Sequence, residues 1–258
     1  MTDHVRVALD SGVLTLTLAR PEKKNALSNA MYEVLVREMK RAETDPAVRV
    51  VLFQAEGDTF TAGNDIMDFA AAATAAAKPR ESLGASPFLQ ALAHATKPYV
   101  AAVQGRAVGV GTTMLLHCDV VIIAEDAQLT TPFVNLALVP EAASTWLMPA
   151  RIGYARAYAM FALGQPVDGK TAVQIGIATA AVPAAEVQKR AMEAARALAT
   201  KPAGALKTTK QLMRDAAAIV AVMEREGAEF AKRLKSPEAM EAFRAFTERR
   251  PPDFTKVG

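Results

Sequence analysis

The chain has 258 residues, 51% of them hydrophobic, and 30 basic residues against 27 acidic ones give a net charge of +3. This length suffices for one substantial α/β domain, or for a domain with a helical appendage, and so weak a charge argues against nucleic acid as the main partner. The single cysteine, Cys118, excludes an intramolecular disulfide, and no apolar stretch reaches the ~20 residues of a membrane span. We therefore expect a soluble, cytoplasmic protein without a metal, since His4, His94 and His117 match no metal-ligand spacing.

The first elements predicted are a β-hairpin and a helix. Residues 5–9 and 13–18 alternate apolar with polar or small side chains around Ser11-Gly12, which is typical of two strands joined by a tight turn. Ser28 then caps a helix whose apolar positions follow helical spacing up to Ala42.

A basic loop separates the hairpin from this helix. It contains Arg20, Lys23 and Lys24. Such a cluster is usually a solvated loop, and its functional alternative is a set of contacts with the phosphates of a ligand bound nearby.

A glycine turn follows the next predicted strand, residues 48–54. In the turn, residues 60–65, Gly63 removes the side chain that would otherwise obstruct a bound molecule, and such a turn can offer a free backbone N–H. The alanine-rich residues 70–77 form either a plain helix or a mobile lid over the site, and residues 82–95 form another amphipathic helix.

The central stretch, residues 97–125, is expected to form a strand, a glycine turn, a buried helix over 112–118 and a second strand. A helix that is apolar all round lies inside the protein, so the free N–H groups of its N-terminus point into the interior, where an anion or a developing oxyanion can meet them. Alternatively, Gly105, Gly109 and Gly111 only permit close packing of helix on sheet. Cys118 fits a buried small side chain better than a reactive thiolate.

Glu141 lies between Pro140 and a run of small residues. It is interpreted either as an N-terminal helix residue stabilised by the helix dipole or as a carboxylate aimed into a pocket. Helices are predicted over 155–163, 168–174, 183–200, 203–215, 219–235 and, after the Ser236 cap, up to 249. We predict an α/β core over 1–195 and a C-terminal helical region over 196–258 that packs on a neighbouring subunit.

Four ordered motifs resemble the crotonase superfamily, the enoyl-CoA hydratase/isomerase family, over nearly the whole length. They are Arg20-Pro21 with Asn25-Ala26-Leu27, the turn Phe60 to Asp65, the stretch from Lys97-Pro98 to Cys118-Asp119, and Pro132 to Glu141. The resemblance implies a ClpP/crotonase spiral of ββα units with C-terminal trimerisation helices, and a homotrimer or a dimer of trimers. It also implies an acyl-CoA thioester substrate and no separate cofactor, since coenzyme A is part of the substrate.

The resemblance also assigns roles to residues. In this family two backbone N–H groups bind the thioester carbonyl, and they map onto Asn64 and Val110. The coenzyme A moiety is expected along Ala62, Gly63, Asn64, Asp65 and Ile66, with Lys23 and Lys24 near its phosphates. Hydratases of the family carry two glutamates, at positions that correspond here to Thr113 and Phe133, so both hydratase carboxylates are absent.

The stretch from Thr131 to Glu141 instead looks like the peroxisomal-type 3,2-enoyl-CoA isomerases and their bacterial relatives, which work with one glutamate. That position maps onto Glu141, and burial beside Phe133 and Trp146 should raise its pKa and improve it as a base. The resemblance therefore predicts an enoyl-CoA delta isomerase. The alternatives are an enoyl-CoA hydratase or another acyl-CoA reaction of this fold, and a non-catalytic acyl-CoA-binding or RNA-binding member.

Overall fold

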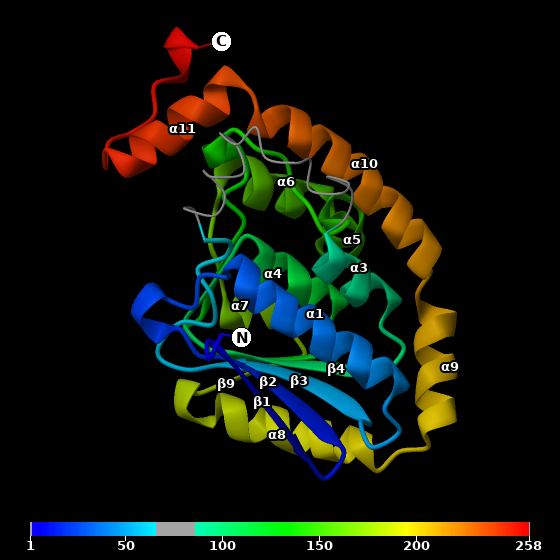
Figure 1. Cartoon of the computed structure of the whole chain (residues 1–258). Coiled ribbons are helices and arrows are strands. Elements are labelled where there is room, and N and C mark those ends of the chain that lie inside the picture. The colour runs from blue at the N-terminus through cyan, green and yellow to red at the C-terminus, as the bar shows by residue number, and fades with distance from the viewer. Residues whose placement is uncertain (1, 66–85, 258) are drawn as a thin grey trace.

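The computed structural model describes residues 2–65 and 86–257, which form a six-stranded sheet, a smaller three-stranded sheet and surrounding helices (Figure 1). In the order in which they lie, the strands of the large sheet are β1 (Val5–Asp10), β2 (Val13–Leu18), β3 (Val50–Ala55), β4 (Tyr99–Val103), β6 (Val120–Ala124) and β9 (Ala180–Val182). β1 and β2 form the predicted antiparallel hairpin, and every later neighbour pair is parallel. The predicted α/β class is confirmed.

The three-stranded sheet was not predicted from the sequence. It consists of β5 (Arg106–Val108), β7 (Gln128–Thr130) and β8 (Val167–Asp168), with β5 and β7 parallel and β7 and β8 antiparallel. Strands of two or three residues are too short to show the period-2 alternation by which a strand is recognised, and β9 was missed for the same reason.

The helices account for most of the remaining described chain. They are α1 (Asn29–Thr44), α3 (Pro87–His94), α4 (Val110–Thr113), α5 (Ser144–Ile152), α6 (Tyr154–Leu163), α7 (Gly169–Gln174), α8 (Val187–Ala199), α9 (Ala203–Met213), α10 (Ala216–Leu234) and α11 (Pro237–Thr247). Short 3-10 turns are η1 (Pro21–Lys23), η2 (Met114–His117), η3 (Val134–Leu136), η4 (Ala184–Glu186) and η5 (Phe254–Lys256).

The large sheet lies between two layers of helices. α8 packs on β2, β3, β4 and β6, and α1, α3 and α4 lie on the opposite side of the sheet, as Figure 1 shows. α9 and α10 then run up one edge of the molecule, and α11 extends beyond it at the C-terminal end. The domain boundary predicted at 195/196 falls inside α8 and stays a prediction.

Most predicted elements are present within a few residues of their expected bounds. α1 begins directly after Ser28, whose hydroxyl accepts the N–H of Met31 at 3.4 Å, and its buried face carries Val34, Leu35 and Met39. A helix with Glu141 in its first turn was one of two predicted interpretations, but α5 begins only at Ser144 and continues through Pro149, which normally argues against a helix. Of the helix predicted over 82–95, the described part forms α3, and the segment 70–77 lies outside the described residues.

The buried helix of the central stretch differs from the prediction in shape. Instead of one helix over 112–118, the chain forms α4, whose residues are all buried, and continues as the 3-10 turn η2. The glycines that precede it flank β5, and Gly109 is the N-cap of α4 with φ 57°. A φ in this region strains any residue with a Cβ, which explains a glycine at this position. The N-terminus of α4 is nevertheless buried, as predicted.

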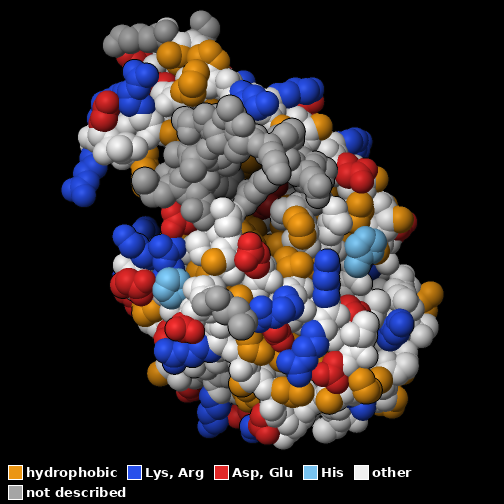
Figure 2. Space-filling model, in the orientation of Figure 1, with side chains coloured by type: hydrophobic (Ala, Val, Ile, Leu, Met, Phe, Trp, Pro, Cys, Tyr) orange, Lys and Arg blue, Asp and Glu red, His pale blue; other side chains and the backbone are white. Residues whose placement is uncertain are grey.

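The described part of the face shown in Figure 2 is mixed in charge. On the face shown in Figure 2, Lys and Arg side chains are interspersed with Asp and Glu side chains, in keeping with the net charge of +3. No helix of the described residues is long and apolar enough to cross a membrane.

An ion pair between a buried lysine and a partly exposed aspartate attaches α9 to the large sheet. The Lys210 ammonium on α9 donates to Asp119 Oδ2 at 2.7 Å and to the carbonyl of Lys97 at 2.8 Å, and the same Asp119 oxygen accepts the N–H of Tyr99 at the start of β4. The Lys210 side chain is 8% exposed. Removing one partner of such a pair leaves a buried charge uncompensated.

We therefore expect Asp119→Ala to lower the free energy of unfolding by about 1.5–3 kcal/mol, because Lys210 would lose its charged hydrogen-bond partner on the solvent-screened side of the pair. Urea unfolding followed by circular dichroism measures the change. The double variant Asp119→Ala/Lys210→Met should recover part of the loss, and Lys207→Met, an exposed position on the same helix, is the control. A double variant no more stable than Asp119→Ala would contradict this account.

Candidate active site

The glycine turn at residues 61–64 is held by the segment that carries the Arg20 to Leu27 motif. Ala62 N–H donates to the carbonyl of Lys24 at 2.9 Å, and Leu27 N–H donates to the carbonyl of Gly63 at 2.8 Å. The Thr61 hydroxyl donates to the carbonyl of Asn25 at 2.7 Å. The motif near the N-terminus thus fixes the backbone of a turn that lies far along the chain.

The same turn packs directly on the segment that leads into α4. Thr61 N–H donates to the carbonyl of Arg106 at 3.0 Å, and Val108 N–H donates to the carbonyl of Thr61 at 3.0 Å. A Cβ on Gly63, whose φ is 88°, would lie 2.8 Å from the Val108 carbonyl oxygen. Glycine is therefore needed here both for the backbone angle and for the close approach of the two segments.

Within the described residues, several backbone amides have no acceptor where these segments meet, among them those of Asn64 and Val110. The N–H groups of Asn64 and Val110 make no hydrogen bond to any acceptor within residues 2–65 and 86–257. Val110 is the first residue of α4, where a helix leaves its N–H groups unsatisfied. Buried N–H groups normally have a partner, so a pair of free amides indicates a site for an oxygen atom of a ligand.

A carboxylate lies one helical turn from the Val110 amide. The Thr113 hydroxyl, on α4, donates to Glu141 Oε1 at 2.6 Å. Glu141 itself precedes α5 in a turn, in which Ser144 N–H donates to the Glu141 carbonyl at 3.1 Å. Glu141 is therefore a carboxylate aimed at α4, and the alternative interpretation, that it lies in a helix, is wrong.

Burial raises the pKa of Glu141 to about 7. The Thr113 hydrogen bond acts in the opposite direction because it favours the ionised form, and the negative charge of Glu226 adds to the increase. A carboxyl with a pKa near 7 is well matched to proton transfer at neutral pH.

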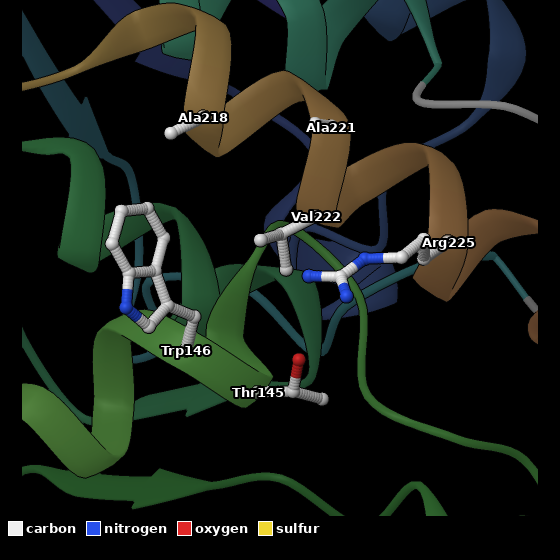
Figure 3. A pocket seen from close by; sticks show the side chains of 6 residues that line it. All are labelled: Thr145, Trp146, Ala218, Ala221, Val222 and Arg225. Atoms are coloured by element: carbon white, nitrogen blue, oxygen red, sulfur yellow. The ribbon is translucent and has the colours of Figure 1, made fainter.

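Trp146 is 44% exposed and lines an open cavity between α5 and α10 (Figure 3). That it lies beside Glu141 stays a prediction. Phe133 is buried and its ring packs against Phe161.

Two residues that sequence analysis did not single out contact the site. The Tyr32 hydroxyl on α1 donates to Asn64 Oδ1 at 2.5 Å, and the Glu226 carboxylate on α10 binds the backbone that follows Glu141. Tyr32 and Glu226 lie on amphipathic helices, where their types are unremarkable. Only the tertiary contact distinguishes them from other helix residues.

Of the residues predicted to contact coenzyme A, Asp65 and Lys24 are engaged in ion pairs within the chain. Asp65 Oδ2 accepts from the Arg20 guanidinium at 2.6 Å, which favours the role of shaping the turn. Lys24 pairs with Asp58 at 2.9 Å on the surface, and Lys23 lies in η1. Ile66 lies outside the described residues.

Cys118 and His117 have structural roles and not chemical ones. Burial raises the pKa of the Cys118 thiol to about 12, so it is not a thiolate at neutral pH. Burial lowers the pKa of His117 to about 3, which keeps its imidazole neutral. Within the part of the chain that the structure describes, no cluster of His, Cys, Asp and Glu could hold a metal ion.

Residues 8–257 match the sequence profile of the enoyl-CoA hydratase/isomerase family. The chain belongs to this family. The predicted resemblance is thereby confirmed, and the protein is an enzyme of the acyl-CoA-using crotonase group.

Named members of the enoyl-CoA hydratase/isomerase family match almost the whole chain. It is 32% identical over 263 residues to 1,2-epoxyphenylacetyl-CoA isomerase of Escherichia coli (strain K12), covering 99% of each protein. It is 30% identical to enoyl-CoA delta isomerase 2 of Rattus norvegicus, over 96% of this chain and 64% of the rat protein. Other relatives at similar identity have hydratase names.

A solved structure of the same family has the same fold. The enoyl-CoA hydratase/isomerase of Pseudoalteromonas atlantica T6c superimposes with a TM-score of 0.90 at 38% identity, covering 98% of this chain and 100% of that one. The α/β fold described above is therefore the crotonase fold. The relatives include both isomerases and hydratases, so their names do not decide which reaction this chain catalyses.

Thr113→Val is expected to raise the pKa of Glu141 above about 7, because the hydroxyl that favours the ionised carboxylate is lost. The measurement is a carbon NMR titration of protein labelled at the glutamate carboxyl carbon. Glu141→Gln identifies the resonance by its absence. A titration that stays in place or moves to lower pH would contradict the assignment of Thr113 as the donor.

The pKa of Glu141 also makes stability depend on pH. Its pKa rises from 4.5 unfolded to about 7 folded, so between these pH values the folded state holds a proton that the unfolded state has lost, and stability falls as pH rises. Glu141→Gln removes this cost. We expect Glu141→Gln to stabilise the protein relative to wild type more at pH 8 than at pH 4. The difference between the two stabilisations should be on the order of 2 kcal/mol, measured by urea unfolding at each pH. Glu224→Gln, exposed on α10, should show no such difference.

Proposed function

We propose that this protein is an enoyl-CoA delta isomerase, which moves the double bond of a 3-enoyl-CoA thioester to the 2-position with Glu141 as the only acid and base. The observation that carries the proposal is the Glu141 carboxylate, 2.6 Å from the Thr113 hydroxyl and one turn of α4 from an amide without an acceptor. The delta isomerase name of the rat relative supports the same reaction.

The first step needs a bound thioester carbonyl. The N–H groups of Asn64 and Val110 are the proposed donors to its oxygen. Both belong to backbone that is fixed by neighbouring hydrogen bonds, so little reorganisation is needed when the carbonyl becomes an enolate. In related chemistry the loss of one such donor costs about 3 kcal/mol of transition-state stabilisation.

The second step is proton transfer by one carboxylate. Ionised Glu141 removes a proton from the α carbon, and the electron pair delocalises over the thioester oxygen and the 3,4-double bond as a dienolate. The protonated Glu141 then returns the same proton to the γ carbon, which leaves the double bond between C2 and C3. No water is consumed, and the enzyme ends in its starting protonation state.

The hydratase alternative lacks its two carboxylates. Addition of water needs a base for the water and an acid for the α carbon. At the two corresponding positions this chain has Thr113, whose hydroxyl is occupied by Glu141, and Phe133, which is buried and apolar. A single carboxylate suits a proton transfer between two carbons of the same substrate.

The remaining contacts are proposed by analogy with the family. Ala62 to Ile66 would lie along the coenzyme A moiety, with Lys23 near its phosphates and Lys24 able to reach them by exchanging its surface partner Asp58. The C-terminal helices would assemble the chain into a trimer or a dimer of trimers, in the cytoplasm.

The test offers the purified protein 3-enoyl-CoA and 2-enoyl-CoA thioesters, follows the conjugated 2-enoyl thioester by its ultraviolet absorbance and measures the mass of the products. We expect the 3-enoyl substrate to convert without a change of mass and the 2-enoyl substrate not to gain water. Glu141→Gln should lower the isomerisation rate by about 10²–10⁴-fold while acyl-CoA binding by calorimetry is retained. The value of kcat/KM should decrease as the pH is lowered past about 7, because Glu141 must be ionised to accept a proton.

Thr113→Val is the control for this experiment, since it changes the environment of the base without removing it. Gain of one water by 2-enoyl-CoA would favour the hydratase alternative instead. Binding of acyl-CoA without α-proton exchange in deuterated water would indicate a non-catalytic member, and retained turnover in Glu141→Gln would refute the assigned base.

A further inference from the structure

We propose that Glu226 is a positioning residue, whose carboxylate on α10 holds the turn after Glu141 and thereby keeps the Glu141 carboxylate at the Thr113 hydroxyl. The kinetic part of this inference rests on the proposed function, and its geometric part does not. Glu226 lies 83 residues beyond Ala143 in the sequence, on a different helix, and is 6% exposed.

The Glu226 carboxylate is fully engaged with one short stretch of backbone. Its Oε2 accepts the N–H of Ala143 at 2.6 Å, and its Oε1 accepts the N–H of Thr145 at 2.9 Å and the Thr145 hydroxyl at 2.5 Å. Ala143 is the N-cap of α5 and has no side chain that could cap it. Glu226 thus supplies from α10 the acceptor that the N-terminus of α5 lacks in its own sequence.

The turn needs such support because its backbone is strained. Ala142 and Ala143 have φ values of 65° and 55°, in the left-handed region that residues with a Cβ rarely adopt. Two such residues in succession persist only where surrounding contacts hold them. Since they directly follow Glu141, relaxation of either would change the direction in which the Glu141 side chain leaves the backbone.

A second contact holds the other side of the turn. His117 Nε2–H, on η2, donates to the carbonyl of Ala142 at 2.8 Å, and His117 Nδ1 accepts from the Arg214 guanidinium. The neutral imidazole carries one proton, and because Arg214 donates to Nδ1 that proton is on Nε2. The peptide units of Ala142 and Ala143 are therefore held between a donor on η2 and an acceptor on α10.

Glu226 also acts on Glu141 through its charge. Burial is the main reason that the pKa of Glu141 is raised, and the negative charge of Glu226 raises it further. Burial raises the pKa of Glu226 itself, against the effect of its three hydrogen bonds and of the neighbouring Arg225. His117 is neutral, so the charge that bears on Glu141 from this side of the turn is that of Glu226.

Figure 3 shows the packing beside this contact. Thr145, at the start of α5, directs its hydroxyl toward α10, and Val222 and Arg225 of α10 lie on either side of it. The Trp146 indole packs beside the same helix.

The experiment replaces Glu226 by Ala, with Glu224→Gln on the same helix as the matched control, since Glu224 is exposed. Glu226→Ala should lower kcat for isomerisation by about 10²-fold, as small displacements of a catalytic group do, while the Kd for acyl-CoA stays near the wild-type value. In carbon NMR the titration of Glu141 should move from about 7 toward 4.5, because the carboxyl leaves its buried position and the second charge is gone. The control should change neither quantity.

If Glu226→Ala does not fold, Glu226→Gln keeps the volume and one acceptor oxygen, and the titration of Glu141 should move in the same direction. The inference is overturned if a folded Glu226 variant leaves both kcat and the titration of Glu141 unchanged. Absence of isomerisation in the wild type would overturn the proposed function alone, because the titration would still report the position of Glu141.

Discussion

The buried N-terminus of α4 is the constraint on which the rest of this site depends. A helix that begins inside a protein presents backbone N–H groups to the interior, and each needs an acceptor. Thr112 and Thr113 N–H bond back to the carbonyl of Gly109, but Val110 and Gly111 N–H have no acceptor in the described part of the chain. The Asn64 amide of the glycine turn likewise has no acceptor among the described residues. We propose that a ligand oxygen accepts from these amides.

The Glu141 carboxylate beside α4 is held from several elements at once. Glu141 contacts Thr113 on α4, and the strained turn that follows it is bonded to His117 on η2 and to Glu226 on α10. This arrangement has a stability cost, since two left-handed alanines and two nearby buried carboxyls would be avoided in a fold under selection for stability alone. Such local strain is commonly found where a functional group must be held in one direction.

Membership of the enoyl-CoA hydratase/isomerase family defines the substrate class, and the named relatives include both isomerases and hydratases. Within one fold the reaction depends on which carboxylates face the thioester, so a substitution at one or two positions can change it. Here the threonine at one hydratase position is hydrogen-bonded to the remaining glutamate. Thr113 takes the place expected for one hydratase glutamate, and its hydroxyl also lowers the pKa of Glu141.

The sequence by itself determined the long periodic elements and the family. The hairpin, α1, the β4 and β6 strands and the C-terminal helices could be predicted, because each repeats its apolar pattern over enough residues to be recognised. The glycine turn and Glu141 could be found because motifs are local. The short strands of the second sheet, the bounds of α5 with its internal Pro149, and the contacts of Tyr32 and Glu226 were decided only by the tertiary structure. Their contacts join residues far apart in the chain, and a hydrogen bond between two distant segments leaves no periodic trace in either of them.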